Sequence, residues 1–274
     1  MTPYNHRESM VGPSVLGPWL LDKDEALPVL KYAFDKGINT WDVADTYSNG
    51  ESEGILGAAI KHYNIPRSKL VIMSKCFQFV DEEKGPIDPA TLTSNNGPRV
   101  NRVGLSRKHI LDAGGHDVPP KEIMKALNDV IESGKVRYTG ASSEEREMNP
   151  DCNYTGVGLF PWSSLAAGVL AHSWTDRTDA REQKDPFLKL LFRGEDQNTN
   201  RAVVDRVEEL AQKQGVAMAN IAQSWLIAKG CMPICGLERE ERIDQAVEAL
   251  QGTLSDEEIK YLEELYVPKM SFPF

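Results

Sequence analysis

The sequence lacks long hydrophobic runs and has few cysteines. No apolar stretch approaches the roughly 18 residues that a membrane-spanning helix requires, and the first ten residues lack the apolar segment of a secretion signal. We therefore expect a cytoplasmic protein without a membrane span. The cysteines are scattered and lack the second pair or nearby histidine of a zinc site, which predicts reduced thiols and no bound metal. They are Cys76, Cys152, Cys231 and Cys235.

Positive charge is also in short supply. The 274 residues include 31 Lys and Arg against 41 Asp and Glu, for a formal net charge of −10. This balance disfavours a nonspecific nucleic-acid surface or binding to an anionic membrane. No internal repeat or low-complexity block divides the chain, and its length suits one large α/β domain over residues 1–274. Any phosphate-bearing ligand must therefore be bound by local groups.

Hydrophobic periodicity alternates between strand-like and helix-like stretches. Asp22 with Glu25, and Ser255 with Glu258, have the spacing of helix-start capping boxes. Strands expected over residues 38–43 and 70–75 flank a helix over 51–63. Such alternation indicates βαβ units and a parallel sheet. Further strands are expected over 136–141, 156–162 and 232–236, helices over 121–133, 201–214, 218–229, 242–250 and 256–266, and a polar surface loop or lid over 176–200.

Two places interrupt this alternation. A helix-like stretch over residues 106–113 ends at a Gly-Gly pair, and another helix begins near Pro119 with no strand between them. After Ser143, residues 144–155 are too few for a helix and a further strand, because a crossover alone takes about a dozen residues. We therefore expect two strand positions to be missing.

An acid, a phenol and an amine follow the first two strand-like runs. Asp42 and Tyr47 stand in Trp-Asp-Val-Ala-Asp-Thr-Tyr-Ser-Asn-Gly at 41–50, and Lys75 ends Val-Ile-Met-Ser-Lys at 71–75. A phenol titrates near about 10, so it is a useful acid at neutral pH only where a cation stabilises the phenolate. Lys75 can supply this cation, and Asp42 can keep the ammonium charged. The trio predicts a general acid, although each residue alone fits a strand-end cap, a loop aromatic or a solvated lysine.

Four segments together resemble the aldo-keto reductases, specifically the fungal subgroup similar to aryl-alcohol dehydrogenases and versiconal hemiacetal acetate reductase. Two contain the trio, at 37–50 and 71–75; the others are Gly-Lys-Val-Arg-Tyr-Thr-Gly-Ala-Ser-Ser at 134–143 and Pro-Trp-Ser-Ser-Leu-Ala-Ala-Gly-Val-Leu at 161–170. The resemblance, which runs from roughly Val15 to the C-terminus, implies a (β/α)8 TIM barrel. It also implies reduction of aldehydes or ketones by hydride transfer from NADPH, without a Rossmann domain.

The resemblance implies roles for individual residues. Tyr47 would protonate the carbonyl oxygen, Lys75 would lower the pKa of this phenol, and Asp42 would hold Lys75. A guanidinium is the natural partner of the adenosine 2′-phosphate, although three glutamates nearby leave open a simple salt-bridged helix face. The implied cofactor contacts are Ser142 and Ser143 at the nicotinamide, Ser163, Leu165 and Gly168 at the pyrophosphate, and Gly236, Arg239, Arg242 and Gln245 at the adenosine end.

The chain departs from the family at the two interruptions. The family has a catalytic His at the end of its fourth strand, in a run resembling Leu-Gln-Ile-His-Arg, and this run is absent. His116 matches the loop beyond that strand, so we do not give it the catalytic role. The sixth strand and its Gln-Asn pair are also missing, and the first strand is truncated to Val15–Trp19. We therefore expect an incomplete barrel, open or rearranged.

Three hypotheses follow. The protein is an NADPH-dependent reductase of a small carbonyl compound, aromatic or polyketide-derived; or it is a catalytically impaired relative that still binds NADP; or it is a shortened gene product that does not fold stably. The first rests on the trio, and the second on the absent His combined with retained cofactor segments. The third rests on the abruptness of the two junctions. The sequence does not indicate an oligomeric state.

Overall fold

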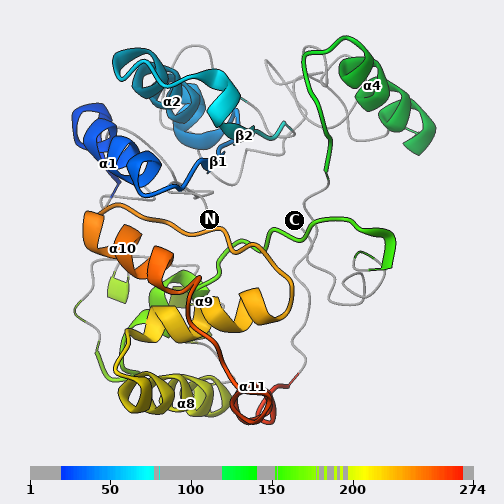
Figure 1. Cartoon of the computed structure of the whole chain (residues 1–274). Helices are drawn as coiled ribbons and strands as arrows, with labels where there is room; N and C mark the ends of the chain where they lie inside the picture. The colour runs from blue at the N-terminus through cyan, green and yellow to red at the C-terminus, as the bar shows by residue number, and fades with distance from the viewer. Residues whose placement is uncertain are drawn as a thin grey trace.

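The structure is a computed structural model and describes residues 20–76, 80, 119–140, 152, 154–176, 178, 182–183, 188–189, 192–193 and 197–267. In Figure 1 the helices and strands of the N-terminal half lie above a C-terminal group of helices, and a separate helix lies to the side. The N-terminal half contains α1 (Lys23–Asp35), β1 (Thr40–Asp42), η1 (Tyr47–Gly50), α2 (Glu51–His62), η2 (Arg67–Lys69) and β2 (Val71–Met73).

Helix α1 begins at the capping box that the sequence predicts. The Asp22 carboxylate accepts a hydrogen bond from the Glu25 N–H at 2.9 Å, and the Glu25 carboxylate accepts one from the Asp22 N–H at the same distance. This reciprocal arrangement satisfies two backbone donors that a helix start leaves free. The inner face of α1 then buries Leu30 against Trp41 of β1 and Ile55 of α2. The core of the N-terminal half therefore fixes the direction of β1.

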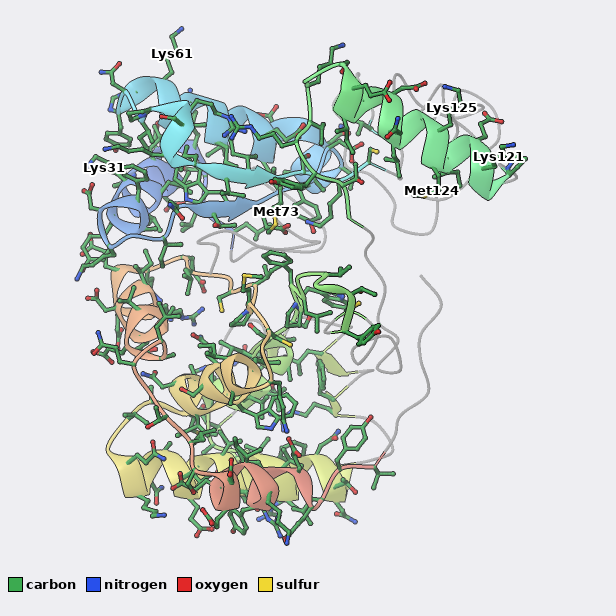
Figure 2. All side chains as sticks on the ribbon, turned by 45° about the vertical axis from the view of Figure 1, so that its right-hand side comes forward. Lys31, Lys61, Met73, Lys121, Met124 and Lys125 are labelled. Carbon is green, nitrogen blue, oxygen red and sulfur yellow. The ribbon has the colours of Figure 1, made fainter. Side chains whose placement is uncertain are left out.

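Strands β1 and β2 pair in parallel, as the βαβ pattern predicts. Asp42 lies opposite Met73, and the pairing continues past the strands, where Val43 N–H donates to the Met73 carbonyl at 2.8 Å and Asp45 N–H to the Lys75 carbonyl at 3.1 Å. Figure 2 shows Met73 on the side of β2 that faces the C-terminal half. Because the carboxyl ends of parallel strands meet at one edge, the residues after β1 and β2 are brought together there.

The C-terminal half is helical, and its core is built between three helices. It contains η5 (Ala166–Ala171), α8 (Gln197–Gln214), α9 (Met218–Ala228), α10 (Glu240–Glu248) and α11 (Asp256–Glu263). Helix α11 begins at the predicted Ser255–Glu258 capping box. Buried side chains of α8, α9 and α11 pack together, namely Val207, Leu210, Ala211, Ile221 and Leu262.

The two halves meet where α1 packs against α10. Tyr32 donates a hydrogen bond to Asp244 at 3.0 Å, and the Lys36 ammonium lies 2.6 Å from the same carboxylate. This pair of contacts raises the pKa of Lys36 and lowers the pKa of Asp244. Beneath them lies one apolar cluster of buried residues from both halves, namely Ala33, Ile38, Cys235, Leu237, Ile243 and Ala246.

The expected later strands are only partly confirmed. The prediction of a strand over 136–141 is wrong for residues 136–140, which are irregular, and Tyr138 is 88% exposed. Residues 156–162 and 232–236 form no full strands; Leu159 and Cys231 make an isolated parallel bridge, extended by Met232 N–H donating to the Leu159 carbonyl at 2.8 Å. A side-chain pattern alone does not make a strand, because the backbone also needs a neighbouring partner along its length.

Helix α4 (Pro120–Glu132) confirms the helix expected over 121–133 to within one residue. Both figures draw it apart from the other helices, and of its apolar residues Ala126 is buried whereas Met124 is 63% exposed. Among the described residues, no helix is long and apolar enough to span a membrane.

The polar stretch over 176–200 is packed at some of its described positions and exposed at others, such as Thr178 and Lys189. Leu188 is buried against α8 in a cluster with Trp174 and Val204. Arg193 pairs with Glu182 at 2.7 Å, and its guanidinium carbon lies 3.9 Å from the centre of the Trp174 ring. Both charged side chains are largely buried. A purely solvated loop is therefore wrong for these positions, because the stretch contributes side chains to the core, and a lid stays a prediction.

The cluster between α1 and α10 predicts a large cost for Ile243→Ala. Ile243 is 0% exposed, and removing a buried isoleucine to alanine costs about 2–5 kcal/mol of unfolding free energy because a cavity is left. Urea unfolding followed by circular dichroism measures this change. The control is Leu250→Ala, since Leu250 follows α10 and is 58% exposed. Equal unfolding free energies for the two variants would contradict the packing described here.

Candidate active site

The centre of the candidate site is an ion pair between the ends of β1 and β2. The Lys75 ammonium lies 2.6 Å from both carboxylate oxygens of Asp42 and donates a third hydrogen bond to the Val43 carbonyl at 3.2 Å. The Asp42 side chain is 2% exposed, whereas that of Lys75 is 37% exposed. Burial raises the pKa of Asp42, and the adjacent ammonium opposes this rise. The lysine therefore presents a fixed positive charge at the edge of the sheet.

Tyr47 lies next to this charge. Its side chain is 5% exposed, and the Lys75 ammonium lies 5.1 Å from the centre of its ring. A cation within about 6 Å of an aromatic ring interacts favourably with it, and a phenolate formed at the same ring would be stabilised further. The structure therefore brings together Asp42, Tyr47 and Lys75, as the sequence predicts.

A tight turn holds Tyr47 in this position. After Tyr47 the backbone is left-handed at Ser48 (φ 50°), Asn49 (φ 54°) and Gly50 (φ 90°) before α2 begins. Glycine adopts this conformation without strain, but non-glycine residues rarely do. Before these residues, the Tyr47 N–H donates to the Ala44 carbonyl at 3.2 Å, which closes a turn over residues 44–47. The backbone conformation thus fixes the direction from which the phenol approaches Lys75.

A second carboxyl group, missed by the sequence analysis, lies beside the trio. Burial raises the pKa of Asp45 to about 7, and the like charge of Glu53 contributes. Burial also raises the pKa of the Cys76 thiol, as does the neighbouring Asp45. Asp45 stands in the quoted motif, but the sequence does not reveal burial, which is what distinguishes it from a solvated turn residue.

The loop expected at the pyrophosphate contains several residues with left-handed backbone conformation. Left-handed φ angles occur at Ser163 (51°), Ala166 (49°), Ala167 (57°) and Gly168 (100°). Turns that combine left- and right-handed residues direct successive N–H groups into a concave surface that suits anions. Apart from Gly168, its two chain neighbours and the nearby backbone of η5, no described residue has a heavy atom within 4 Å of the position that a Cβ on Gly168 would take. Leu165 immediately precedes η5, so all three predicted contacts lie in this loop.

The loop is tied to the segment expected at the adenosine end. The Ser164 hydroxyl is buried and donates to the Ile234 carbonyl at 2.7 Å. Gly236 follows this segment, and α10 then begins after Arg239 without a side-chain cap. A helix start of this kind leaves backbone N–H groups available for an anion.

The charges around α10 are mixed. Arg239 is exposed, whereas Arg242 forms an ion pair with Glu238 one turn earlier. Glu240 and Glu241 occupy the first turn of the helix. The salt-bridged helix face that the sequence left open is therefore present for Arg242, and Arg239 is the guanidinium that remains exposed. Gln245 is partly buried on the same helix.

Several predicted positions lie outside the described residues. These are the nicotinamide contacts Ser142 and Ser143, the histidine His116, and both junctions where strands are expected to be missing. Within the described part of the chain, no three His, Cys, Asp or Glu side chains gather as a metal site.

Comparison with known proteins supports one family. The profile of the Aldo/keto reductase family matches residues 14–147 and 142–267. A versiconal hemiacetal acetate reductase from Aspergillus parasiticus is 42% identical over 310 positions, covering 93% of this chain and 90% of that protein. A Schizosaccharomyces pombe protein named as an aryl-alcohol dehydrogenase is 38% identical, covering 91% of this chain and 88% of its own length.

Solved structures show the same fold. The glycerol dehydrogenase of Gluconobacter oxydans superposes with a TM-score of 0.69 at 19% identity, over 99% of this chain and 96% of that chain. A thermostable aldo-keto reductase solved with the inhibitor epalrestat gives 0.63 at 20% identity, over 93% and 94% of the two chains. Aldo-keto reductases are (β/α)8 barrels, in which neighbouring strands are parallel. The parallel pairing of β1 and β2 agrees with this fold. The chain is therefore an oxidoreductase of the aldo/keto reductase family, whose members generally use NAD(P)H to reduce small carbonyl compounds to alcohols.

Proposed function

We propose that this protein is an NADPH-dependent reductase of aldehydes or ketones with Tyr47 as the proton donor. The observation that carries the proposal is the Lys75–Asp42 ion pair at 2.6 Å, with the ammonium 5.1 Å from the Tyr47 ring centre. This arrangement supplies what a phenol needs to act as an acid near neutral pH, namely a fixed positive charge next to the ring that becomes a phenolate.

Each residue of the trio has a separate role in the proposed reaction. Tyr47 donates its proton to the carbonyl oxygen as negative charge develops there, and Lys75 stabilises the phenolate that remains. Asp42 fixes Lys75 through two hydrogen bonds. When bound, the dinucleotide supplies the hydride that reduces the carbonyl carbon. Because Asp42 and Tyr47 are buried, these charges act in surroundings where water screens them weakly.

The residues present fit a dinucleotide. The loop around Gly168 offers backbone donors for a pyrophosphate, and Ser163 and Leu165 lie in the same turn. The segment that would hold the adenosine end contains Gly236, Arg239, Arg242 and Gln245. Preference for the 2′-phosphate rests on Arg239 and Arg242, against the opposing charge of nearby glutamates. Ser142 and Ser143 complete the proposed contacts at the nicotinamide.

The substrate class follows from the relatives alone. Proteins similar to this chain carry the names versiconal hemiacetal acetate reductase and aryl-alcohol dehydrogenase, which supports an aromatic or polyketide-derived carbonyl compound. A cytoplasmic location, a single domain and the absence of nucleic-acid binding stay predictions of the sequence.

We also propose that the barrel is incomplete, without the fourth and sixth strands and with a truncated first strand. The family profile matches in two pieces that meet at residues 142–147, next to the junction expected after Ser143. The alignment to the Aspergillus reductase extends over 310 positions, more than the 274 residues of the chain, so some positions of that relative face no residue here. Both facts support internal shortening and, with it, the loss of the catalytic His.

Loss of the His favours a second candidate function, namely an impaired relative that binds NADP without turnover. The third hypothesis is a shortened gene product that does not fold stably. Titration of purified protein with NADPH, followed by fluorescence, separates them. Saturable binding with turnover of an aromatic aldehyde supports the reductase, and binding without turnover of any carbonyl supports the impaired relative. Transcript reads that cross Ala113–Gly114 and Ser143–Glu144 without extra codons would exclude misassigned exons.

Replacement of Tyr47 by phenylalanine tests the proton donor. We expect Tyr47→Phe to reduce NADPH oxidation with an aromatic aldehyde by roughly 100- to 10,000-fold, because the variant retains the ring and loses the proton. NADPH binding should remain, which shows that the variant is folded. Tyr138→Phe is the matched control, since Tyr138 is 88% exposed, and it should retain full activity. Undiminished turnover in Tyr47→Phe would refute the assignment.

Replacement of the arginines near α10 tests the 2′-phosphate site. Arg239→Ala should weaken NADPH binding by roughly tenfold and leave NADH binding almost unchanged, because one charge-assisted contact is lost. Glu238→Gln should tighten NADPH binding by releasing Arg242 from its ion pair. Arg201→Ala on α8 is the control, as its side chain is 58% exposed. Equal losses for NADPH and NADH would argue against a phosphate contact.

A further inference from the structure

Asp45 is held against the strand that carries Lys75. Its backbone N–H donates to the Lys75 carbonyl at 3.1 Å, so the two residues are neighbours across the ends of β1 and β2. Its Oδ1 atom is buried and has no hydrogen-bond partner in the part of the chain that the structure describes. Asp45 lies within the turn over residues 44–47 that leads to Tyr47. Asp45 therefore belongs to the same rigid edge as the reacting groups.

The charged groups around Asp45 come from three elements. Glu53 on α2 accepts a hydrogen bond from the Ser74 hydroxyl at 2.6 Å, which brings a second carboxylate to the end of β2. Lys75 is the ammonium, and its hydrogen bonds are already directed to Asp42 on β1 and to a carbonyl. Cys76, the residue that follows Lys75, adds a thiol group. Three carboxyl groups thus surround one cation.

Three carboxylates near one ammonium cannot all ionise without cost. Asp42 takes both short contacts with Lys75. Among the described residues the buried Oδ1 of Asp45 has no hydrogen-bond partner, and Glu53 is a like-charged neighbour, although the Thr46 backbone N–H donates to the Asp45 carboxyl and favours its ionised form. These conditions, burial first, raise the pKa of Asp45 to about 7. Asp45 is therefore a group near the trio whose charge changes in the physiological range.

We propose that Asp45 is a positioning residue that controls the reaction through Lys75: carbonyl reduction is fastest while its carboxyl is neutral and slows when it loses its proton. This inference rests on the proposed reductase function. The negative charge formed at Asp45 opposes the positive charge of Lys75, so the phenolate that forms at Tyr47 receives less stabilisation. Asp42 cannot take this part, because it remains in the ion pair with Lys75.

The same ionisation affects folding. A carboxyl whose pKa is higher in the folded protein than in the unfolded chain stabilises the fold most fully below the unfolded value of about 4, and this contribution is lost as the pH rises through about 7. The Asp45→Asn variant has no ionisable group at this position, so this loss of stability with rising pH should disappear. The midpoint of thermal unfolding should therefore fall less between about pH 4 and 8 in Asp45→Asn than in the wild type.

Alkylation of Cys76 reports the charge on Asp45 without any turnover. Ionised Asp45 opposes formation of the Cys76 thiolate, so the Asp45→Asn variant should alkylate at Cys76 severalfold faster than the wild type at about pH 8. Peptide mass spectrometry distinguishes Cys76 from the other cysteines. Asp24→Asn is the control, because Asp24 is exposed in the first turn of α1, and it should react like the wild type. Equal rates in Asp45→Asn and the wild type would overturn the proposed charge.

The pH profile of reduction tests the effect on Lys75. In single-turnover experiments with NADPH and an aromatic aldehyde, the wild-type rate should fall roughly tenfold as the pH rises through about 7, whereas the rate of Asp45→Asn should stay nearly constant. Glu53→Gln should move the wild-type fall to lower pH, because a like charge beside Asp45 is removed. If Asp45→Asn does not fold, the shift of the pH profile in Glu53→Gln still tests the proposal.

The outcomes separate the two proposals. Identical pH profiles for the wild type, Asp45→Asn and Glu53→Gln would refute control by Asp45 while leaving the reductase function intact. Absence of turnover in the wild type with every carbonyl would refute the reductase function, and with it the effect on rate. In that case a change in Cys76 alkylation in Asp45→Asn would still support the ionisation of Asp45.

Discussion

The fixed position of the Lys75 ammonium is the constraint on which the site depends. Asp42 is buried and Lys75 is partly exposed, so the pair costs the solvation of one carboxylate and recovers it through two short hydrogen bonds. Together with the bond to the Val43 carbonyl, these contacts restrain the otherwise flexible lysine side chain and hold the cation at the edge of the sheet. Tyr47 can act as an acid near neutral pH only because of this charge, since an isolated phenol is a weak acid.

The backbone around the pair explains why the arrangement is rigid. Parallel pairing carries past β1 and β2 to the Asp45–Lys75 hydrogen bond, and left-handed residues turn the chain back at Tyr47. The crowding of carboxyl groups that results is unfavourable for Asp45. Functional sites often retain such unfavourable features where the surrounding fold enforces them, and the core of α1, β1 and α2 provides that support here.

The elements that depend on local sequence were predicted well. The capping boxes at α1 and α11 are present, and α2, α4, α8 and α9 occur where apolar periodicity placed them, with ends that differ by a few residues. Helices satisfy their own backbone hydrogen bonds, so a local pattern suffices to define them. Strands do not, and residues 136–140 show the consequence, since a suitable pattern has no strand partner among the described residues.

The sequence by itself determined the family, the order of the first βαβ unit and the identity of Asp42, Tyr47 and Lys75, because these are properties of residue type and spacing. Tertiary structure alone revealed Asp45 as a second buried carboxyl group beside the trio, with an Oδ1 atom that has no hydrogen-bond partner among the described residues. It also decided that Arg242 is engaged by Glu238 whereas Arg239 is exposed. The physical reason is burial: the charge state of a carboxyl depends on its surroundings, and residues distant in sequence create those surroundings only when the chain folds.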